Sequence, residues 1–382
     1  MESPEAYIPI DRRLAMAQGR TLPDRTRGTG LFADLSGFTA LTDALVQVLG
    51  PRRGAEELPT QLNRVYDAMI AEVHRYGGTV IGFAGDAITC WFDGDDACRA
   101  TACALAMQQA MQPFAAVPVP GAGTVALAVK VAIAAGSARR FVVGDPAVQR
   151  IDVLAGATLD RLAAGEHHAE RGEVLLDAGA SRQLGARLTV AAWRAGDAPD
   201  ERFAVVTALA GAVAPTPWPE LTPGALDTAE VRAWLLPPVY ERLQLGRGEF
   251  LTELRPGVSL FLRFGGIDYD RDVAAGSKLD AYVRWVQTVL TQYGGFLIQL
   301  TIGDKGSYLY AAFGAPVAHP DDASRAVAAA LELRRVPPEL EGIRSIQIGI
   351  SQGRMRTGAY GSTTRRTYGV LGPDANLAAR LM

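Results

Sequence analysis

The sequence has few of the residues that build disulfide frameworks or histidine-based metal centres. It contains 3 cysteines and 4 histidines among 382 residues. Cys90, Cys98 and Cys103 form no CxxC pair and no even-numbered framework, which is typical of a reducing compartment. The histidines show no HExxH or similar spacing, and the sequence has no GxxxxGK(S/T) phosphate-binding loop. We therefore expect a cytoplasmic protein whose cysteines are buried apolar residues.

The chain also lacks a large net charge and a long apolar run. Its 38 Lys+Arg against 41 Asp+Glu give a net charge of -3, which provides no general attraction to nucleic acid or to an anionic membrane. The longest apolar stretch, near residues 203–214, is well below the ~18 residues that a membrane span needs. The N-terminal residues have no apolar core of the kind that a signal peptide carries. We expect neither a nucleic-acid partner nor a membrane partner.

What the sequence does contain is the composition of a globular protein and an internal repeat. Hydrophobic residues make up 48% and charged residues 21%, and about 150 residues per domain predicts two or three domains. Residues 75–81 (RYGGTVI) match 292–298 (QYGGFLI), and 131–136 (VAIAAG) match 348–353 (IGISQG), both 217 positions apart. Residues 95–107 also match 321–333. This repeat predicts two homologous domains.

The repeat and a proline-rich segment divide the chain. We expect a polar N-terminal arm at 1–28, a first domain at 29–214, a linker at 215–257 and a second domain at 258–382. The segment APTPWPELTPG, which begins at Ala214, carries four prolines, and proline extends neither a helix nor a central strand. By comparison with the first repeat, we expect the second domain to be truncated at its C-terminus, with room for further C-terminal domains in a longer parent chain.

Strand and helix patterns follow one another irregularly in the first domain. Strands are predicted at 30–35, 79–83, 87–92 and 125–133, and a helix at 95–111. Before them, an apolar stripe at helical spacing comprises Leu62, Val65, Met69 and Val73. Strands and helices without strict βα alternation indicate an α+β fold.

Two aspartates stand at the ends of apolar strands. Asp34 in LFADLSGFTALTD is followed at once by Ser-Gly-Phe-Thr, a turn whose amides could face an anion. Asp86 in IGFAGDAITCWF lies in a Gly-Asp turn between two strands. Such carboxylates suit Mg²⁺, which takes oxygen ligands and shares them with substrate phosphate. From spacing alone, an aspartate that caps or solvates a turn is the alternative.

Together these motifs resemble the class III nucleotidyl cyclases. FADLSGFT, the GGTVI strand and the GDA turn carry the resemblance in the first repeat, and VLGPDANLAARLM looks like the catalytic helix of the family in the second. FAGDA, with RGAEEL upstream, and the linker sequence FLTELRP look like the soluble, bicarbonate-regulated adenylyl cyclase branch. The resemblance implies two tandem ferredoxin-like (βαββαβ) domains packed as a pseudo-symmetric head-to-tail pair, with a nucleoside triphosphate between them.

The resemblance also implies the roles of individual residues. Asp34, Asp86 and the Leu35 carbonyl would hold two Mg²⁺ ions, for which Mn²⁺ could substitute. Asn376 and Arg380, one helical turn apart, would orient the ribose and stabilise the charge that develops at the α-phosphate. The implied reaction converts ATP to 3′,5′-cyclic AMP and pyrophosphate.

Further positions resemble the triphosphate contacts of the family. The amides of Gly37, Phe38 and Thr39 are similar to its phosphate cradle. Lys305 in GDKGS resembles a lysine that anchors the terminal phosphates, and a solvated hairpin lysine is the alternative. We expect Arg365 to be an exposed loop charge.

The two repeats have diverged in complementary ways. The position of Asp34 corresponds to Arg263, so the second repeat has lost the first metal carboxylate. The catalytic pair of the second repeat corresponds to Leu159 and Ala163, so the first repeat has lost that pair. One cleft keeps a full set of groups, which favours a single working site.

Base selection and regulation depart from the family pattern. The adenine-selecting lysine is Gly82 here and its partner is Gly369, so ATP, GTP and relaxed specificity remain open.

Arg161 and Met382 look like two ligands of the family's bicarbonate site, but the third, a lysine, is again Gly82. An anion pocket with one cation binds weakly, and we expect little or no bicarbonate response.

Two functions from different classes remain. The first is an active adenylate cyclase. The second, motivated by the two glycines and by the early end of the second repeat, is a catalytically inactive nucleotide-binding module that regulates further domains. Retention of both metal carboxylates and of the catalytic pair favours the first.

Overall fold

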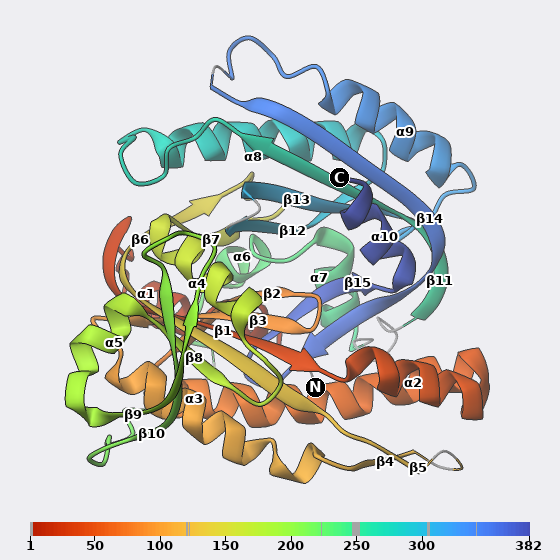
Figure 1. Ribbon diagram of the computed structural model, residues 1–382. Coiled ribbons are helices and arrows are strands. Elements are labelled where there is room, and N and C mark those ends of the chain that lie inside the picture. Colours follow the sequence, from red (N-terminus) through yellow and green to blue (C-terminus); the bar gives the residue numbers. More distant parts are fainter. Residues whose placement is uncertain are drawn as a thin grey trace.

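The computed structural model describes residues 3–119, 121, 123–222, 224–246, 253–303, 306–340 and 342–382 (Figure 1). We call residues 25–209 unit 1 and residues 253–381 unit 2. Unit 1 occupies the lower half of Figure 1 and unit 2 the upper half. The elements outside the units are η1 (Pro4–Tyr7), α1 (Ile10–Ala17), α6 (Thr228–Arg232) and α7 (Pro237–Gln244).

Unit 1 is built on a sheet in the order β2-β3-β1-β6-β8-β10-β9, with β7 also paired to β6. Its strands are β1 (Arg25–Ser36), β2 (Thr79–Ala84), β3 (Ala87–Asp93), β4 (Val117–Val119), β5 (Gly123–Val125), β6 (Ala128–Val143), β7 (Ile151–Ala155), β8 (Val174–Asp177), β9 (Leu188–Ala195) and β10 (Arg202–Leu209). Its helices are α2 (Phe38–Arg75), α3 (Cys98–Ala110), η2 (Gln112–Phe114), α4 (Ala157–His168), α5 (Ala178–Leu184) and η3 (Gly185–Arg187).

Unit 2 has the sheet order β12-β13-β11-β14-β15. This is the order of β2-β3-β1-β6-β7 in unit 1, as the sequence repeat predicts. The α+β fold class is confirmed. The elements of unit 2 are β11 (Glu253–Gly265), α8 (Ala275–Gln292), β12 (Phe296–Gly303), β13 (Gly306–Phe313), α9 (Asp322–Leu333), β14 (Arg344–Gly361), β15 (Arg366–Leu371) and α10 (Pro373–Leu381).

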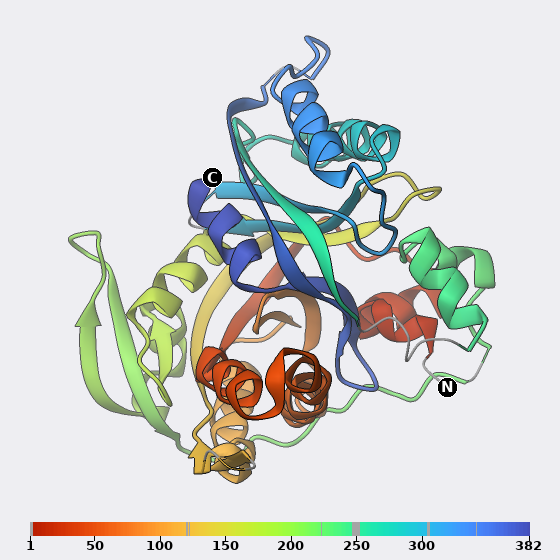
Figure 2. The same cartoon turned by 90° about the vertical axis from the view of Figure 1, so that its right-hand side faces the viewer.

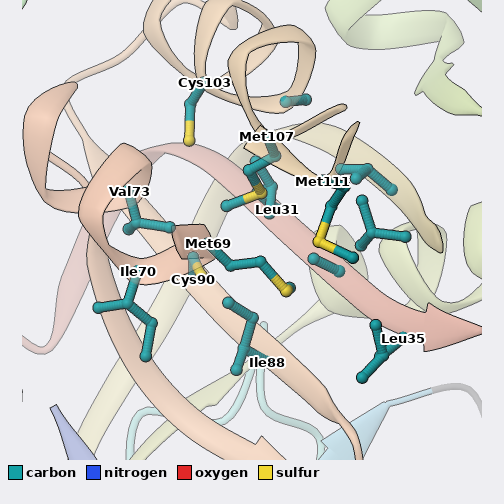
Figure 3. Packing of buried hydrophobic residues seen from close by; sticks show 14 of the residues in the cluster. Leu31, Leu35, Met69, Ile70, Val73, Ile88, Cys90, Cys103, Met107 and Met111 are labelled. Atoms are coloured by element: carbon teal, nitrogen blue, oxygen red, sulfur yellow. The ribbon is translucent and has the colours of Figure 1, made fainter. Parts of the chain in front are cut away.

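The core of unit 1 lies between the sheet and helices α2 and α3 (Figure 3). Met69 and Val73, from the predicted apolar stripe, are fully buried there. Cys90 and Cys103 are buried in the same core, as predicted, and Cys98 packs at its edge. Helix α4 covers the opposite face of the sheet. No helix among the described residues is long and apolar enough to cross a membrane.

The two units exchange apolar side chains at equivalent strand ends. Phe141 and Val143 of β6 pack in the core of unit 2. Tyr360 of β14, the repeat equivalent of Val143, packs in the core of unit 1, and Leu371 packs against that core. Because each sheet completes the other's core at the same position, the units are held by reciprocal contacts.

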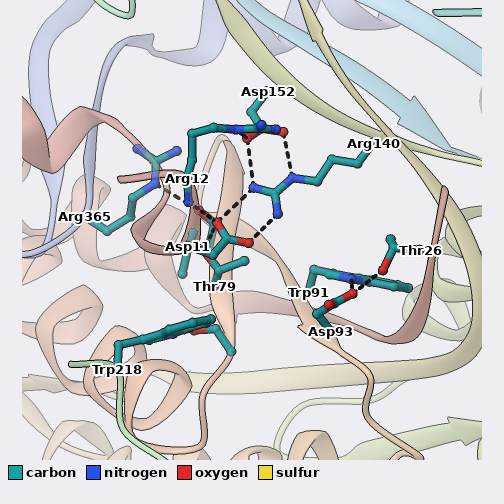
Figure 4. Close-up of polar contacts among 12 residues, drawn as sticks. Asp11, Arg12, Thr26, Thr79, Trp91, Asp93, Arg140, Asp152, Trp218 and Arg365 are labelled. Carbon is teal, nitrogen blue, oxygen red and sulfur yellow. Dashed lines mark hydrogen bonds and ion pairs between the residues drawn. The ribbon is translucent and has the colours of Figure 1, made fainter. Parts of the chain in front are cut away.

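The N-terminal segment differs from the polar arm that the sequence predicts. Helix α1 is packed into the molecule because its charges meet opposite charges from unit 1 (Figure 4). Arg140 forms two 2.8 Å hydrogen bonds with the Asp152 carboxylate and pairs with Asp11. Arg12 Nε lies 3.0 Å from Asp152 Oδ2, and Thr79 donates to Asp11 Oδ1 at 3.1 Å. The buried arginines and aspartates thus satisfy one another.

The expectation that Arg365 is an exposed loop charge is wrong. Its side chain is buried between the units, and its guanidinium donates to the carbonyls of Val80 at 2.9 Å, Ile81 at 2.8 Å and Tyr7 at 2.8 Å. Burial lowers the pKa of Arg365 to about 9. The residue therefore ties unit 2 to β2 of unit 1 and to the N-terminal segment.

Helix α10 packs directly on β14 at Gly349, where the absence of a side chain allows the two backbones to approach closely. A Cβ at Gly349 would lie 2.1 Å from the Ala378 carbonyl oxygen and 2.6 Å from the Met382 nitrogen. We expect Gly349→Ala to lower the free energy of unfolding by about 1–3 kcal/mol, because backbone atoms of α10 must move. Urea unfolding measures this. Gly265→Ala is the control, since its Cβ would meet its nearest atom at 3.9 Å, and equal losses in both variants would contradict the prediction.

Candidate functional site

The sheet of unit 1 brings the two predicted metal carboxylates together. Asp34 lies near the end of β1, opposite Ala87 of β3. Asp86 precedes Ala87 in the tight turn between β2 and β3, where Gly85 adopts a φ of 64°. Antiparallel pairing therefore places both side chains at the same end of adjacent strands.

Burial perturbs both carboxylates, and a neighbouring charge adds to the effect on Asp86. Burial, reinforced by the Asp34 charge, raises the pKa of Asp86 to about 6. Burial also raises the pKa of Asp34, against the lowering effect of Lys130. Burial disfavours the charged form of both carboxylates, and a divalent cation bound between them would offset that cost.

Lys130 is a residue of this site that the sequence interpretation missed. It lies opposite Asp34 in the β1–β6 register, with its Nζ 3.2 Å from Asp34 Oδ2, and it also pairs with Glu166 of α4. The available signal was a lone lysine in the apolar run AVKVAIAA. At the equivalent register of unit 2, Arg263 faces Gln347, so only unit 1 carries this carboxylate and cation.

The turn after β1 leads directly into the N-terminus of α2. Leu35 is buried and pairs with Val129, and Gly37 has a φ of 95° immediately before α2. A Cβ at Gly37 would lie 2.4 Å from the Ala126 carbonyl oxygen, so the turn requires glycine. Phe38 and Thr39 follow as the first residues of α2, where backbone amides have no partner within the helix.

The raised pKa of Asp86 makes the stability of the metal-free protein depend on pH. The folded protein binds this proton more tightly than the unfolded chain, whose ordinary value is 3.8. The stabilising contribution is therefore complete below pH 4 and is lost as the pH rises through about 6. We expect the stability of Asp86→Asn relative to wild type to increase by about 1–2 kcal/mol between pH 4 and pH 7. Urea unfolding at each pH measures the difference, and a constant difference would contradict the assignment.

Unit 2 carries the predicted catalytic pair on α10. Asn376 and Arg380 are exposed, one turn apart on this helix. Arg380 forms no ion pair with any residue that the structure describes. In both views α10 lies above α2, on the side of unit 2 that faces unit 1 (Figures 1 and 2). Lys305 lies outside the described residues.

The opposite cleft is assembled from the equivalent elements but lacks these groups. There α4 of unit 1 approaches β12 of unit 2, and a Cβ on Gly303 would lie 3.8 Å from the Ala163 Cβ. Ala163 corresponds to Arg380, and the nearby Leu159 corresponds to Asn376. The opposite cleft therefore has the apolar side chains of Leu159 and Ala163 at the positions that Asn376 and Arg380 occupy on α10.

Gly82 and Gly369, the two expected base-selecting positions, lie in different surroundings. Gly82 lines a cavity of about 140 Å³ between the units, together with residues of β7 and β12. Gly369 is covered by Tyr360, whose ring carbon Cε1 would be 2.3 Å from a Cβ at that position. The Tyr360 ring is held against Tyr66 and Phe83 at centroid distances of 5.9 and 5.6 Å.

The two expected bicarbonate ligands are not brought together. Arg161 Nε donates to Asp177 Oδ2 at 2.8 Å, and its Nη2 donates to the Ala135 carbonyl oxygen at 2.9 Å. Met382 packs against the apolar cluster between the unit 2 sheet and α7. The arginine charge is thus already neutralised within unit 1.

The resemblance to the class III nucleotidyl cyclases is confirmed, since the curated relatives found are adenylate cyclases. No family model matches the chain. The chain is 25% identical to adenylate cyclase type 10 of Mus musculus over 388 residues, covering 93% of this chain and 23% of the relative. It is 24% identical to the Homo sapiens protein over 396 residues, covering 95% and 24%. The chain thus spans about a quarter of the length of the curated relatives it matches.

A solved structure shares the fold over nearly the whole chain. It is a class III adenylyl cyclase-like ATP-binding protein from Pseudomonas aeruginosa, with a TM-score of 0.60 and 14% identity. The match covers 93% of this chain and 81% of that one.

Proposed function

We propose that this chain is a nucleotidyl cyclase that converts ATP to 3′,5′-cyclic AMP and pyrophosphate at one cleft between its units. The ribose 3′-oxygen attacks the α-phosphorus, the bond from that phosphorus to the pyrophosphate oxygen breaks, and the hydroxyl proton leaves to solvent. GTP is the alternative substrate, because neither Gly82 nor Gly369 offers a side chain to the base.

The observation that carries the proposal is the division of charged groups between the units. Asp34, Asp86 and Lys130 converge in unit 1, and α10 of unit 2 presents Asn376 and Arg380. The equivalent positions in the opposite cleft lack both sets. Reciprocal packing of strand ends supports a pseudo-symmetric head-to-tail pair in which only one cleft works.

The carboxylates fit a pair of divalent cations. Within the described ranges no group of three or more His, Cys, Asp or Glu side chains could hold a metal, so the protein's share is two carboxylates. Mg²⁺ is commonly held by one or two carboxylates and substrate phosphates. Asp34, Asp86 and the Leu35 carbonyl would hold two Mg²⁺ ions, or Mn²⁺ in their place, which would acidify the 3′-hydroxyl and neutralise the triphosphate.

The remaining residues act on the nucleotide directly. Arg380 offers a fork of donors to the charge that grows on the α-phosphate, and Asn376 offers an amide to the ribose. Lys130 lies beside Asp34 and can shift towards a phosphate once a cation holds the carboxylate. The backbone amides at Gly37, Phe38 and Thr39 lie at the same end of the sheet and can donate hydrogen bonds to phosphate oxygens.

A nucleotide-binding module without turnover is the second candidate. Tyr360 covers Gly369, where the resemblance places the base, so a base must move this ring or bind elsewhere. The Pseudomonas aeruginosa structure is described as an ATP-binding protein, which fits the same possibility.

Turnover decides between the two candidates. The full chain is incubated with each nucleoside triphosphate and Mg²⁺ or Mn²⁺, and the product is identified by chromatography and mass spectrometry. A 3′,5′-cyclic nucleotide and stoichiometric pyrophosphate support the cyclase. Binding of nucleotide without product, in both metals, would establish the module instead.

A further inference from the structure

A buried arginine of unit 2 has no hydrogen-bond partner among the residues that the structure describes. Arg356 lies on β14 between Leu254 of β11 and Leu371 of β15, and its side chain is only 7% exposed. Its three guanidinium nitrogens form no hydrogen bond within the part of the chain that the structure describes. A buried charge without a counter-charge is strongly unfavourable, so such a group calls for a ligand.

The internal repeat supplies a comparison for this residue. Arg139 of β6 occupies the same register in unit 1, between Arg25 and Ala155. Its Nε and Nη2 each lie 2.6 Å from an oxygen of Asp24, and this hydrogen bonding raises the pKa of Arg139. The fold therefore stabilises an arginine at this position by supplying a carboxylate.

The described residues of unit 2 do not supply the equivalent carboxylate. Glu253 precedes Leu254, as Asp24 precedes Arg25, but it pairs with Arg255 at 3.4 Å. Arg356 lies four residues before Tyr360 on β14, so the two side chains share one face of the strand, and burial lowers the pKa of Arg356 to about 10. Among the residues that the structure describes, no carboxylate of unit 2 pairs with Arg356 as Asp24 pairs with Arg139.

We propose that Arg356 binds the polyphosphate of a nucleotide between β14 and α2. Tyr66 of α2 packs against Tyr360 at a centroid distance of 5.9 Å, and its hydroxyl donates at 3.2 Å to the carbonyl oxygen of Gly85, which precedes Asp86. An anion at Arg356 thus lies in the direction of the metal carboxylates, on the face of β14 that Tyr360 turns towards unit 1. In naming the anion as a nucleotide's polyphosphate, this inference rests on the proposed function.

Inorganic tripolyphosphate in the absence of divalent cations is the probe that isolates Arg356. Without a cation, Lys130 is held by Asp34 and Glu166, and these carboxylates repel the polyanion. Thermal unfolding and titration calorimetry are measured on the full chain, on Arg356→Met, and on Arg354→Met. Arg354 is an exposed arginine on the same strand and provides the matched control.

Two results are expected together. Arg356→Met without ligand melts at a higher temperature than wild type, because an unpaired buried charge is removed. Tripolyphosphate raises the melting temperature of wild type and of Arg354→Met, whereas its affinity for Arg356→Met is at least ~10-fold weaker. If Arg356→Met does not fold, Arg356→Lys is used, which should retain weaker binding.

Other outcomes overturn the proposal. A lower melting temperature of Arg356→Met without ligand, with unchanged tripolyphosphate binding, would make the residue structural. Protection of wild type by guanosine but not by tripolyphosphate would mean that the guanidinium contacts a base edge. Absence of cyclase turnover with intact tripolyphosphate binding would overturn only the cyclase, and turnover without tripolyphosphate binding would overturn only the anion site.

Discussion

Replacing Asp34 by alanine is expected to lower kcat/KM for cyclisation by at least ~1000-fold in Mg²⁺. The carboxylate is one of two that converge at the end of β1, and both metal positions of the proposed site would depend on it. The variant should also lower the pKa of Asp86, because the neighbouring negative charge that helps to raise it is gone. Kinetics at saturating metal and carbon-detected NMR titration of Asp86 measure the two effects.

The loss should not come from unfolding. Burial is the main cause of the raised pKa of Asp34, so folding disfavours its charged form, and Lys130 keeps Glu166 as a partner in the variant. We therefore expect Asp34→Asn to remain as stable as wild type while it loses activity. Arg263→Ala, at the equivalent position of the opposite cleft, is the matched control and should keep full turnover. Equal loss of activity in the Asp34 and Arg263 variants would contradict a single working cleft.

Local patterns predicted the short, apolar parts of the fold. The strand predicted at 87–92 and the strand at 79–83 each differ from the observed strands by one residue. The predicted helix at 95–111 begins at Cys98, three residues later. In these segments the side chains that face the core come from one continuous pattern, so the sequence neighbourhood decides the structure.

Long-range pairing decided what local patterns could not. The strand predicted at 125–133 extends to Val143 as β6, through polar residues that interrupt the apolar pattern. Arg139 and Arg140 are tolerated there because Asp24 and Asp11 neutralise them from segments more than 100 residues away. The ion pair between Asp11 and Arg140 likewise holds helix α1 against unit 1, where the sequence predicted a polar arm.

In the candidate site, too, some residues could be predicted from local sequence and others depend on tertiary packing. The sequence motifs indicated Asp34 and Asp86 as candidate metal ligands, because an aspartate that directly follows an apolar strand can be recognised from the sequence alone. Lys130 was missed because its partners, Asp34 and Glu166, approach only when β1, β6 and α4 are assembled. Tyr360 over Gly369 and the unpartnered Arg356 depend likewise on the packing of one unit against the other.

Arg380→Ala is expected to lower kcat by about 100- to 1000-fold, which corresponds to the ~3–4 kcal/mol that one donor to a developing oxyanion contributes. KM should change little, because the guanidinium acts on charge that grows in the transition state. Steady-state kinetics with ATP and with GTP measure both parameters. Arg380→Lys should recover only part of kcat, since an ammonium keeps the charge but loses the planar fork.

Stability separates this catalytic loss from a structural one. Arg380 is exposed and its side chain has no ion-pair partner in the described part of the chain, so its removal should change the free energy of unfolding by less than about 0.5 kcal/mol. Arg334→Ala is the control, because this arginine is also exposed at the end of a unit 2 helix. We expect it to turn over like wild type. A kcat that Arg380→Ala leaves intact would mean that α10 does not reach the triphosphate held by unit 1, and the cleft between the units would then not be the site of reaction.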